Sequence, residues 1–154
     1  ELFLAFSASL SKFDNEHGMA NSRARLRMTT LYQVAAANKG IVVGTGNKVE
    51  DFGVGFYTKY GDGGVDISPI ADCNKTEIWE LGKELGILQE IIDAAPTDGL
   101  WDDGRTDEGQ LGLKYQELEE AMKNPNSPNR DKYELIRKQN LHKMEPIPVC
   151  KIPN

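Results

Sequence analysis

Residues 40–75 read GIVVGTGNKVEDFGVGFYTKYGDGGVDISPIADCNK, and this stretch decides the fold that the sequence predicts. Ile41, Val42 and Val43 lie between glycines, which is typical of a short strand buried in a parallel sheet. Residues 44–47, Gly-Thr-Gly-Asn, form the turn expected at the carboxyl end of that strand. Ligands of open α/β sheets bind at such carboxyl ends. The stretch therefore predicts an α/β fold and one wall of an active site.

Two carboxylates follow the predicted turn. Glu50 and Asp51 lie just beyond the strand, in a short helix or turn. Nucleotide enzymes commonly hold Mg²⁺ with one or two carboxylates together with substrate phosphates. Two adjacent acids also occur at the solvated start of a helix that binds no metal, so both interpretations stay open at this point. The glycine-rich turn at residues 61–64 allows close approach of backbone to a ligand, and residues 65–67 alternate like a second strand.

Lys75 stands at an unfavourable place in a predicted helix. Residues 74–77, Asn-Lys-Thr-Glu, have the pattern of a capping box, and the core face of the helix would be Ile78, Leu81 and Leu85. A cation in the first helical turn opposes the helix dipole. Its position therefore indicates an anionic partner held by the lysine and the free helix amides together. A surface lysine without a ligand is the alternative.

The rest of the chain predicts helices, a lid and a tail. Asn21 or Ser22 would cap a helix that ends at residues 38–40, after a helix remnant and a loop over residues 1–20. The other expected helices cover residues 75–85, 87–95, 115–122 and 131–141, with an extended tail over 142–154. Residues 96–112, the lid loop, are rich in Gly, Asp and Thr, and a loop of this length is usually functional or mobile. A disordered acidic surface loop is the alternative.

Composition bounds the class of protein. A chain of 154 residues with 39% hydrophobic and 27% charged residues is typical of one ordinary globular domain. Its formal net charge of -6 argues against a nucleic-acid partner, and no apolar run is long enough to span a membrane. Cys73 and Cys150 lack the spacing of a metal site or a disulfide framework, so we expect a cytoplasmic protein with reduced thiols. The absence of an initiator Met at Glu1 predicts an internal segment of a longer protein.

Three motifs extend this interpretation. They are SRARLRM at residues 22–28, FYTKYGDGGVDISPIADCNKTE at 56–77, and PTDGLW at 96–101 with TDEGQLG at 106–112. Together they resemble the NAD synthetases, ammonia- or glutamine-dependent enzymes of the N-type ATP pyrophosphatase group. The resemblance implies an α/β, three-layer, parallel-sheet nucleotide-binding fold like that of the adenine nucleotide alpha hydrolases, here without its N-terminal strands. Residues 1–154 would then be the C-terminal part of a single synthetase domain.

The resemblance also implies a reaction. ATP activates the nicotinate carboxylate of deamido-NAD as an acyl-adenylate with release of pyrophosphate. Ammonia, supplied free or from glutamine through an upstream domain, then displaces AMP. Mg²⁺ and protein cations are needed because the carboxylate is a poor electrophile that the triphosphate repels. Members of the family are homodimers that build the deamido-NAD site at the subunit interface.

Carried over by position, the residues that resemble the functional sites of the family fall into five groups. The catalytic residues would be Lys75 and Thr97, and the ligands of Mg²⁺ would be Glu50 and Thr97. ATP would contact Thr45, Lys75, His142 and Lys143. The deamido-NAD site would comprise Arg25, Tyr32, Phe56, Lys59, Asp62 and Asp66, and the lid loop would add Asp107 and Glu108.

Two departures from the family pattern bear on activity. The Ser-Gly-Gly-x-Asp-Ser loop that binds pyrophosphate in the family is absent from residues 1–154, so we expect the isolated segment not to catalyse adenylation. Gln110 stands where the family frequently has a glutamate. Two other interpretations stay open. One is a non-catalytic nucleotide-binding or dimerisation fragment, and the other is a different amidating ATP pyrophosphatase of the GMP-synthetase kind.

Overall fold

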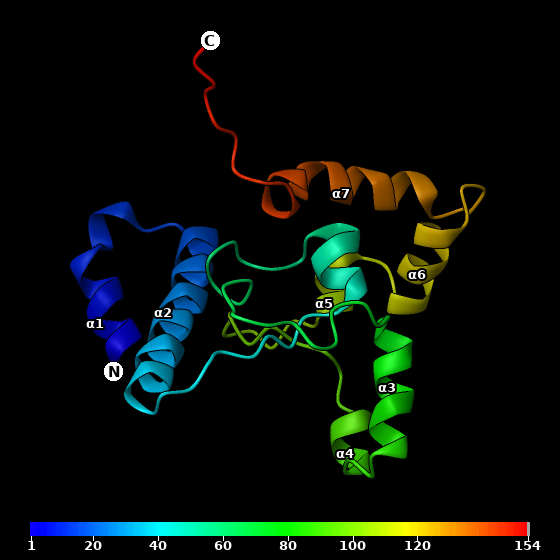
Figure 1. The fold of residues 1–154 in the computed structure, drawn as a ribbon, viewed down its shortest axis with the longest axis horizontal. Coiled ribbons are helices and arrows are strands. Elements are labelled where there is room, and N and C mark those ends of the chain that lie inside the picture. Colours follow the sequence, from blue (N-terminus) through cyan, green and yellow to red (C-terminus); the bar gives the residue numbers. More distant parts are fainter. Residues whose placement is uncertain (154) are drawn as a thin grey trace.

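Helices separated by irregular segments make up the fold, and the computed structural model describes residues 1–153 (Figure 1). In chain order the elements are α1 (Leu2–Ser9), the 3₁₀ helix η1 (Ser11–Phe13), α2 (Glu16–Ala37), the π-helix η2 (Val49–Val54), α3 (Lys75–Glu84), α4 (Gln89–Ile92), α5 (Asp107–Leu111), α6 (Tyr115–Lys123) and α7 (Arg130–Met144). In Figure 1, α2 lies on one side, α3 and α4 lie on the other, and α7 lies across the top. No helix within the described part of the chain has the length and apolar character that a membrane crossing requires.

The predicted strands do not form. Residues 40–44 and 65–67 run parallel and meet at one isolated bridge, between Val43 and Ile67, and residues 1–153 contain no strand. The described residues are thus helical without a sheet, and the parallel direction of this one pairing is the part of the α/β prediction that they show. A strand needs neighbours for its N–H and C=O groups, and this segment has a neighbour along one edge only. Ile41 and Val43 are accordingly 59% and 52% exposed instead of buried.

The hydrophobic core lies where η2, α6 and α7 meet. Val49 and Val54 of η2 are fully buried against Tyr115 and Leu118 of α6, and Tyr133 of α7 packs beside them. The sequence predicted an amphipathic helix in the position of α6, and the structure confirms it. Because α6 buries its first residue in this core, the beginning of α6 is held beside η2.

Contacts near the start of α3 join it to the core, while its far end is exposed. The Thr76 N–H and hydroxyl donate to the Glu119 carboxylate of α6 at 3.0 and 2.6 Å. Trp79 packs edge-on against the core. Of the predicted core face, Ile78 is half-buried, whereas Leu81 and Leu85 are 43% and 69% exposed, so the prediction is wrong for the two leucines. The physical reason is that α3 extends past α6, and the short helix α4 beside its far end does not bury these leucines (Figure 1).

Side-chain caps fix where two helices begin. The Asn74 N–H donates to the Glu77 carboxylate at 2.6 Å, which confirms the predicted cap of α3. The start of α2 was predicted wrongly, near residue 21 or 22. It begins five or more residues earlier because the Asn15 side chain accepts the Gly18 N–H at 2.7 Å and caps the helix there.

The last helix is longer than the sequence predicted. It ends at Met144, whereas the prediction placed an extended tail from residue 142 onward. His142 and Lys143 therefore lie in the last turn of α7. Arg137 joins α7 to η2 by donating to the Gly53 carbonyl at 2.7 Å, which keeps the end of α7 close to the middle of the molecule.

Replacing Leu118 by Ala is expected to lower the free energy of unfolding by about 3 kcal/mol, because it leaves a cavity among fully buried side chains. Urea unfolding followed by circular dichroism measures this change. The matched control is Leu85→Ala at a 69% exposed position, where the expected change is below about 0.5 kcal/mol. Equal losses in the two variants would contradict this position of the core.

Candidate functional site

A cavity of about 440 Å³, here called the central cavity, lies between α2, the turn after residue 44, the start of α3 and the lid loop. The residues predicted from the sequence that line it are Thr45, Glu50, Phe56, Asp62, Lys75, Thr97 and Asp107. They belong to separate stretches of the chain. The fold therefore gathers half of the predicted site residues around one space.

Glu50 and Lys75 form an ion pair in the wall of the central cavity. Glu50 Oε1 and Lys75 Nζ lie 3.2 Å apart, and the side chains are only 15% and 20% exposed. Glu50 lies in η2, where the Asn47 side chain accepts the N–H groups of Val49 and Glu50 at 3.0 and 3.1 Å. Lys75 is the first residue of α3. The pair therefore places the predicted metal ligand beside the predicted phosphate-binding lysine.

Tyr115 contacts both members of this pair, and no sequence motif pointed to it. Its hydroxyl lies 2.5 Å from Glu50 Oε1 and 3.2 Å from Asp107 Oδ2, and Lys75 Nζ lies 4.9 Å from the centre of its ring. Burial, and next the Glu50 carboxylate, raise the pKa of Tyr115, so the phenol remains a hydrogen-bond donor. In the sequence it stands as the first apolar residue of an amphipathic helix, a position that gives no signal of a site.

The two predicted acids of the lid loop have different surroundings. Asp107 is 6% exposed and lines the central cavity, and burial followed by the Glu50 carboxylate raises its pKa. Glu108 does not line the central cavity, and its carboxylate accepts the Tyr115 N–H at 3.1 Å. Asp107 is thus available to a ligand in the cavity, whereas Glu108 provides the hydrogen-bond acceptor for the first N–H group of α6.

Oxygen atoms that suit a magnesium ion face this space. Lys75 and Tyr115 both contact Glu50 Oε1, and Glu50 Oε2 makes no hydrogen bond within residues 1–153. The Thr97 hydroxyl, in the same cavity, donates to the Arg105 carbonyl at 3.2 Å and accepts the Gly99 N–H at 3.3 Å, which leaves it one lone pair. Carboxylate and other hard oxygen atoms are the ligands of Mg²⁺. The residues present therefore fit the predicted cation.

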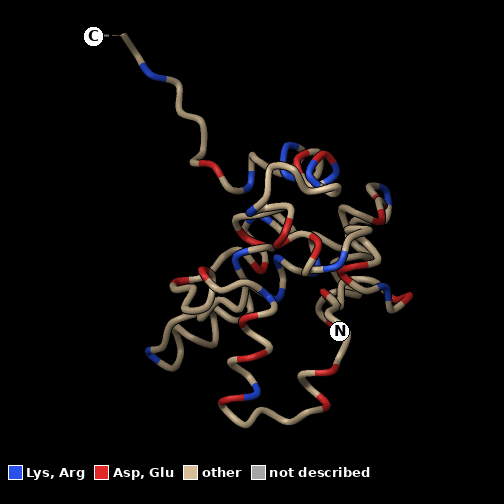
Figure 2. Tube along the Cα trace, turned by 90° about the vertical axis from the view of Figure 1, so that its right-hand side faces the viewer, with Lys and Arg blue, Asp and Glu red and all other residues tan. Residues whose placement is uncertain are grey.

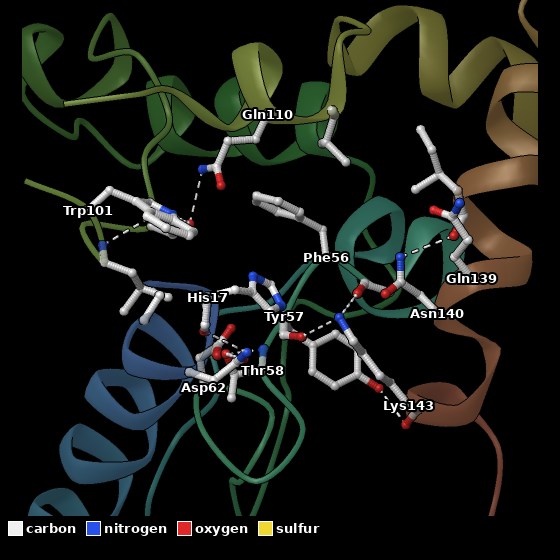
Figure 3. Close-up of a pocket in the computed structure, with 17 residues that line it drawn as sticks. His17, Phe56, Tyr57, Thr58, Asp62, Trp101, Gln110, Gln139, Asn140 and Lys143 are labelled. Carbon is white, nitrogen blue, oxygen red and sulfur yellow. Dashed lines mark hydrogen bonds between the residues drawn. The ribbon is translucent and has the colours of Figure 1, made fainter. Parts of the chain in front are cut away.

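A second cavity of about 320 Å³ adjoins the central cavity (Figure 3). Phe56 and Asp62 line both cavities and lie between them. Lys143 reaches the second cavity from the last turn of α7, and its Nζ donates to the Gly55 and Tyr57 carbonyls, each at 2.8 Å. Burial lowers the pKa of Lys143. The predicted ATP-contacting lysine therefore lies on the other side of Phe56 from Lys75.

The other predicted substrate-binding residues lie outside both cavities. Arg25, Tyr32, Lys59, Asp66 and His142 line neither of them. Arg25 Nε donates to the Lys59 carbonyl at 3.2 Å, and the Lys59 ammonium donates to the His142 carbonyl at 2.6 Å. The Tyr32 hydroxyl donates to Asp66 Oδ1 at 3.2 Å. The structure thus divides the predicted substrate residues into a cavity group and a surface group.

The lid loop is attached to α2. Arg27 of α2 donates to the Asp98 and Gly99 carbonyls at 3.2 and 2.6 Å. The Gln110 side chain, at the position where the family frequently has a glutamate, donates to Asp98 Oδ2 at 3.0 Å, and Trp101 Nε1 donates to the same atom at 3.3 Å. These contacts place the lid loop along one border of the central cavity.

Comparison with known proteins gives the family of the chain. A solved NMN synthetase from Francisella tularensis matches 99% of the chain with a TM-score of 0.86 and 35% identity, and the match covers 63% of that protein. The chain belongs to the NAD synthase family, whose model matches residues 1–152.

Relatives with curated names agree with this family. An NH(3)-dependent NAD(+) synthetase from Alkaliphilus oremlandii is 44% identical over 135 residues, which are 86% of this chain and 53% of that protein. One from Carboxydothermus hydrogenoformans is 50% identical over 104 residues, 68% of this chain and 42% of that protein. A solved NAD synthetase from Campylobacter jejuni, 24% identical with a TM-score of 0.70 over 97% of this chain and 62% of that one, shows the shared fold. The chain spans about half the length of the curated relatives it matches.

Asp51, next to Glu50, gives stability a pH dependence. Burial, together with the Glu50 and Asp62 carboxylates, raises the pKa of Asp51 to about 6. Between roughly pH 4 and pH 6 the folded chain therefore retains a proton that the unfolded chain has released. The free energy of unfolding falls as the pH rises through this window.

Asp51→Asn is expected to raise the free energy of unfolding at neutral pH by about 1 kcal/mol, because it removes a carboxylate whose charged form is disfavoured and partly screened by solvent. Urea unfolding below pH 4 and at neutral pH measures the gain, which should be confined to the higher pH. Asp14→Asn, at an exposed acid, is the matched control and should change neither value. A gain at low pH alone would contradict the assignment to Asp51.

Proposed function

We propose that this chain is part of a synthetase that uses ATP to amidate deamido-NAD to NAD through a nicotinate acyl-adenylate, with release of AMP and pyrophosphate. The observation that carries the proposal is the contact between Glu50 and Lys75 in the wall of one cavity. Membership of the NAD synthase family and the names of the relatives support the reaction, with free ammonia as the nitrogen donor.

In this proposal Lys75 binds the phosphates of ATP, and Glu50 and Thr97 hold their Mg²⁺. Adenylation brings a substrate carboxylate against a triphosphate, and both are anionic. A fixed ammonium in a largely buried wall reduces that repulsion more strongly than it would in water. Mg²⁺, when bound, neutralises phosphate charge and polarises the phosphorus that is attacked. Thr45 lines the same cavity and supplies a further hydroxyl to the nucleotide.

Deamido-NAD would contact both the cavity group and the surface group of the predicted substrate residues. Phe56 and Asp62 lie between the two cavities, where an aromatic ring can stack on nicotinate. The surface group, of which Arg25 and Tyr32 lie on α2, would be completed by a second copy of the chain. Leu31 and Val34 of α2 support this homodimer because they are large apolar side chains that are 55% and 54% exposed. The lid loop would cover the bound nucleotide.

A second candidate function is the amidation of a nicotinate mononucleotide. The observation in its favour is the match to a protein named as an NMN synthetase, at 35% identity and with a TM-score of 0.86. Glu50 and Lys75 would bind Mg²⁺ and the ATP phosphates here too, because the nicotinate carboxylate is activated by the same reaction. The two candidates differ in whether the site must also hold an adenylate half of the substrate.

The isolated 154 residues are proposed to be inactive in adenylation. A pyrophosphate leaving group needs backbone donors or cations on several sides. The Ser-Gly-Gly-x-Asp-Ser loop that would provide part of this set does not occur in the sequence. A fragment that binds nucleotide or dimerises without turnover is therefore the expectation for the segment alone.

In a synthetase that contains this sequence, pyrophosphate release from ATP is expected only when deamido-NAD and Mg²⁺ are both present. Lys75→Ala should lower the rate by about a hundredfold or more, because it removes a charge from a largely buried site. A coupled assay for pyrophosphate measures the rate. Lys83→Ala, in the exposed last turn of the same helix, is the matched control and should leave it unchanged.

Three outcomes would change the proposal. Turnover with nicotinate mononucleotide and none with deamido-NAD would favour the second candidate. Comparable turnover with xanthosine monophosphate would move the chain to the GMP-synthetase kind of enzyme. An unaffected rate in the Lys75→Ala variant would remove the ion pair from the mechanism.

A further inference from the structure

Two carboxylates meet at one phenolic hydroxyl in the wall of the central cavity. The Tyr115 hydroxyl lies 2.5 Å from Glu50 Oε1 and 3.2 Å from Asp107 Oδ2. A phenol has one proton to donate, and the shorter contact places it on Glu50. The Lys75 ammonium also donates to Glu50. Asp107 therefore receives no full hydrogen bond from Tyr115 and none from Lys75.

Asp107 is left with an oxygen that has no protein partner. Its side chain is only 6% exposed, and Oδ1 has no hydrogen-bond partner within residues 1–153. Buried polar atoms nearly always have a partner, so such an oxygen indicates a partner that is not protein. Asn47 Nδ2 is a second atom of this kind, but Asn47 lines neither cavity. Asp107 lines the central cavity beside Glu50.

We propose that Asp107 is a second carboxylate ligand of the divalent cation and that it acts together with Glu50. The contacts are assigned to Asp107 Oδ1 and Glu50 Oε2, the oxygens that no protein donor occupies. Tyr115 is a positioning residue, since its hydroxyl contacts the other oxygen of each carboxylate and holds the pair together. Two carboxylates beside one ammonium leave an excess negative charge that a cation neutralises.

The chemistry of the site favours a hard cation. Carboxylate oxygens suit Mg²⁺ and Mn²⁺, and neither a thiol nor an imidazole lines the central cavity. Mg²⁺ is usually held by one or two carboxylates together with substrate phosphates. The pair thus supplies the two carboxylates of such a site, beside the Thr97 hydroxyl. This inference rests on the proposed function in one respect, because the phosphates that complete the coordination come from the nucleotide. Binding of the metal to the two carboxylates does not depend on that function.

A proton on Asp107 would satisfy Oδ1 without a metal, and a titration with Mn²⁺ alone separates the two cases. The paramagnetic resonance signal of free Mn²⁺ measures binding to the 154-residue chain. One saturable site is expected. Asp107→Asn and Glu50→Gln should each weaken it by about tenfold or more, and Tyr115→Phe by about tenfold. Asp131→Asn, with the same change of charge at an exposed acid of α7, is the matched control and should bind normally.

Thermal unfolding shows whether Asp107 acts as a ligand or only as a structural residue. Without metal, Asp107→Asn should unfold at the same temperature as the parent chain or higher, because it removes the charge of a buried carboxylate whose Oδ1 has no hydrogen-bond partner. With Mn²⁺, the parent chain should gain stability and the variant should not. A variant that loses stability equally with and without Mn²⁺, or that binds Mn²⁺ as the parent chain does, would overturn the proposal. Absence of a saturable site in the parent chain would also overturn it.

The metal measurement does not depend on turnover. Mn²⁺ binding that requires Asp107, in a protein that does not amidate deamido-NAD, would refute the proposed function and leave the cation site standing. Amidation by the full synthetase with unchanged Mn²⁺ affinity in Asp107→Asn would refute the second ligand and leave the function standing.

Discussion

The burial of Tyr115 is the constraint on which the site depends. Its ring packs edge-on against Trp79 of α3, with the ring centres 6.1 Å apart, and is fully buried in the core. The same residue places its hydroxyl on Glu50 and its ring beneath Lys75. Because one side chain belongs to both the core and the cavity wall, the packing of α6 against η2 sets the position of the acid and the lysine.

Local signals in the sequence located two of the polar residues that line the central cavity. The capping pattern before Lys75 correctly located the start of α3, and Glu50 was expected just beyond a turn at the end of an apolar run. Both residues line one cavity even though the apolar run does not form a strand. Turn and cap chemistry depends on neighbours within four residues, so it survives when the distant pairing of the sheet does not.

Features that depend on distant contacts were not predictable from the sequence. Tyr115 has the same pattern as any core residue of an amphipathic helix, and its role arises only where α6 meets η2. Leu81 and Leu85 have helical spacing, but the short helix α4, which lies beside that end of α3, leaves both side chains exposed. Likewise, the apolar spacing of residues 41–43 indicates a strand, whereas sheet formation requires neighbours that residues 1–153 provide at a single bridge, Val43 with Ile67. Hydrophobic spacing tells which face is apolar and does not tell what covers it.

The central claim is that Glu50 and Lys75 share a pocket for a polyphosphate and its metal. The most direct measurement is a crystal structure of a synthetase containing this sequence, with a non-hydrolysable ATP analogue and Mn²⁺ bound. We expect Mn²⁺ density within coordination distance of a Glu50 oxygen and a phosphate within hydrogen-bond distance of Lys75 Nζ. Nucleotide and metal bound elsewhere, with the ion pair of Glu50 and Lys75 untouched, would contradict it.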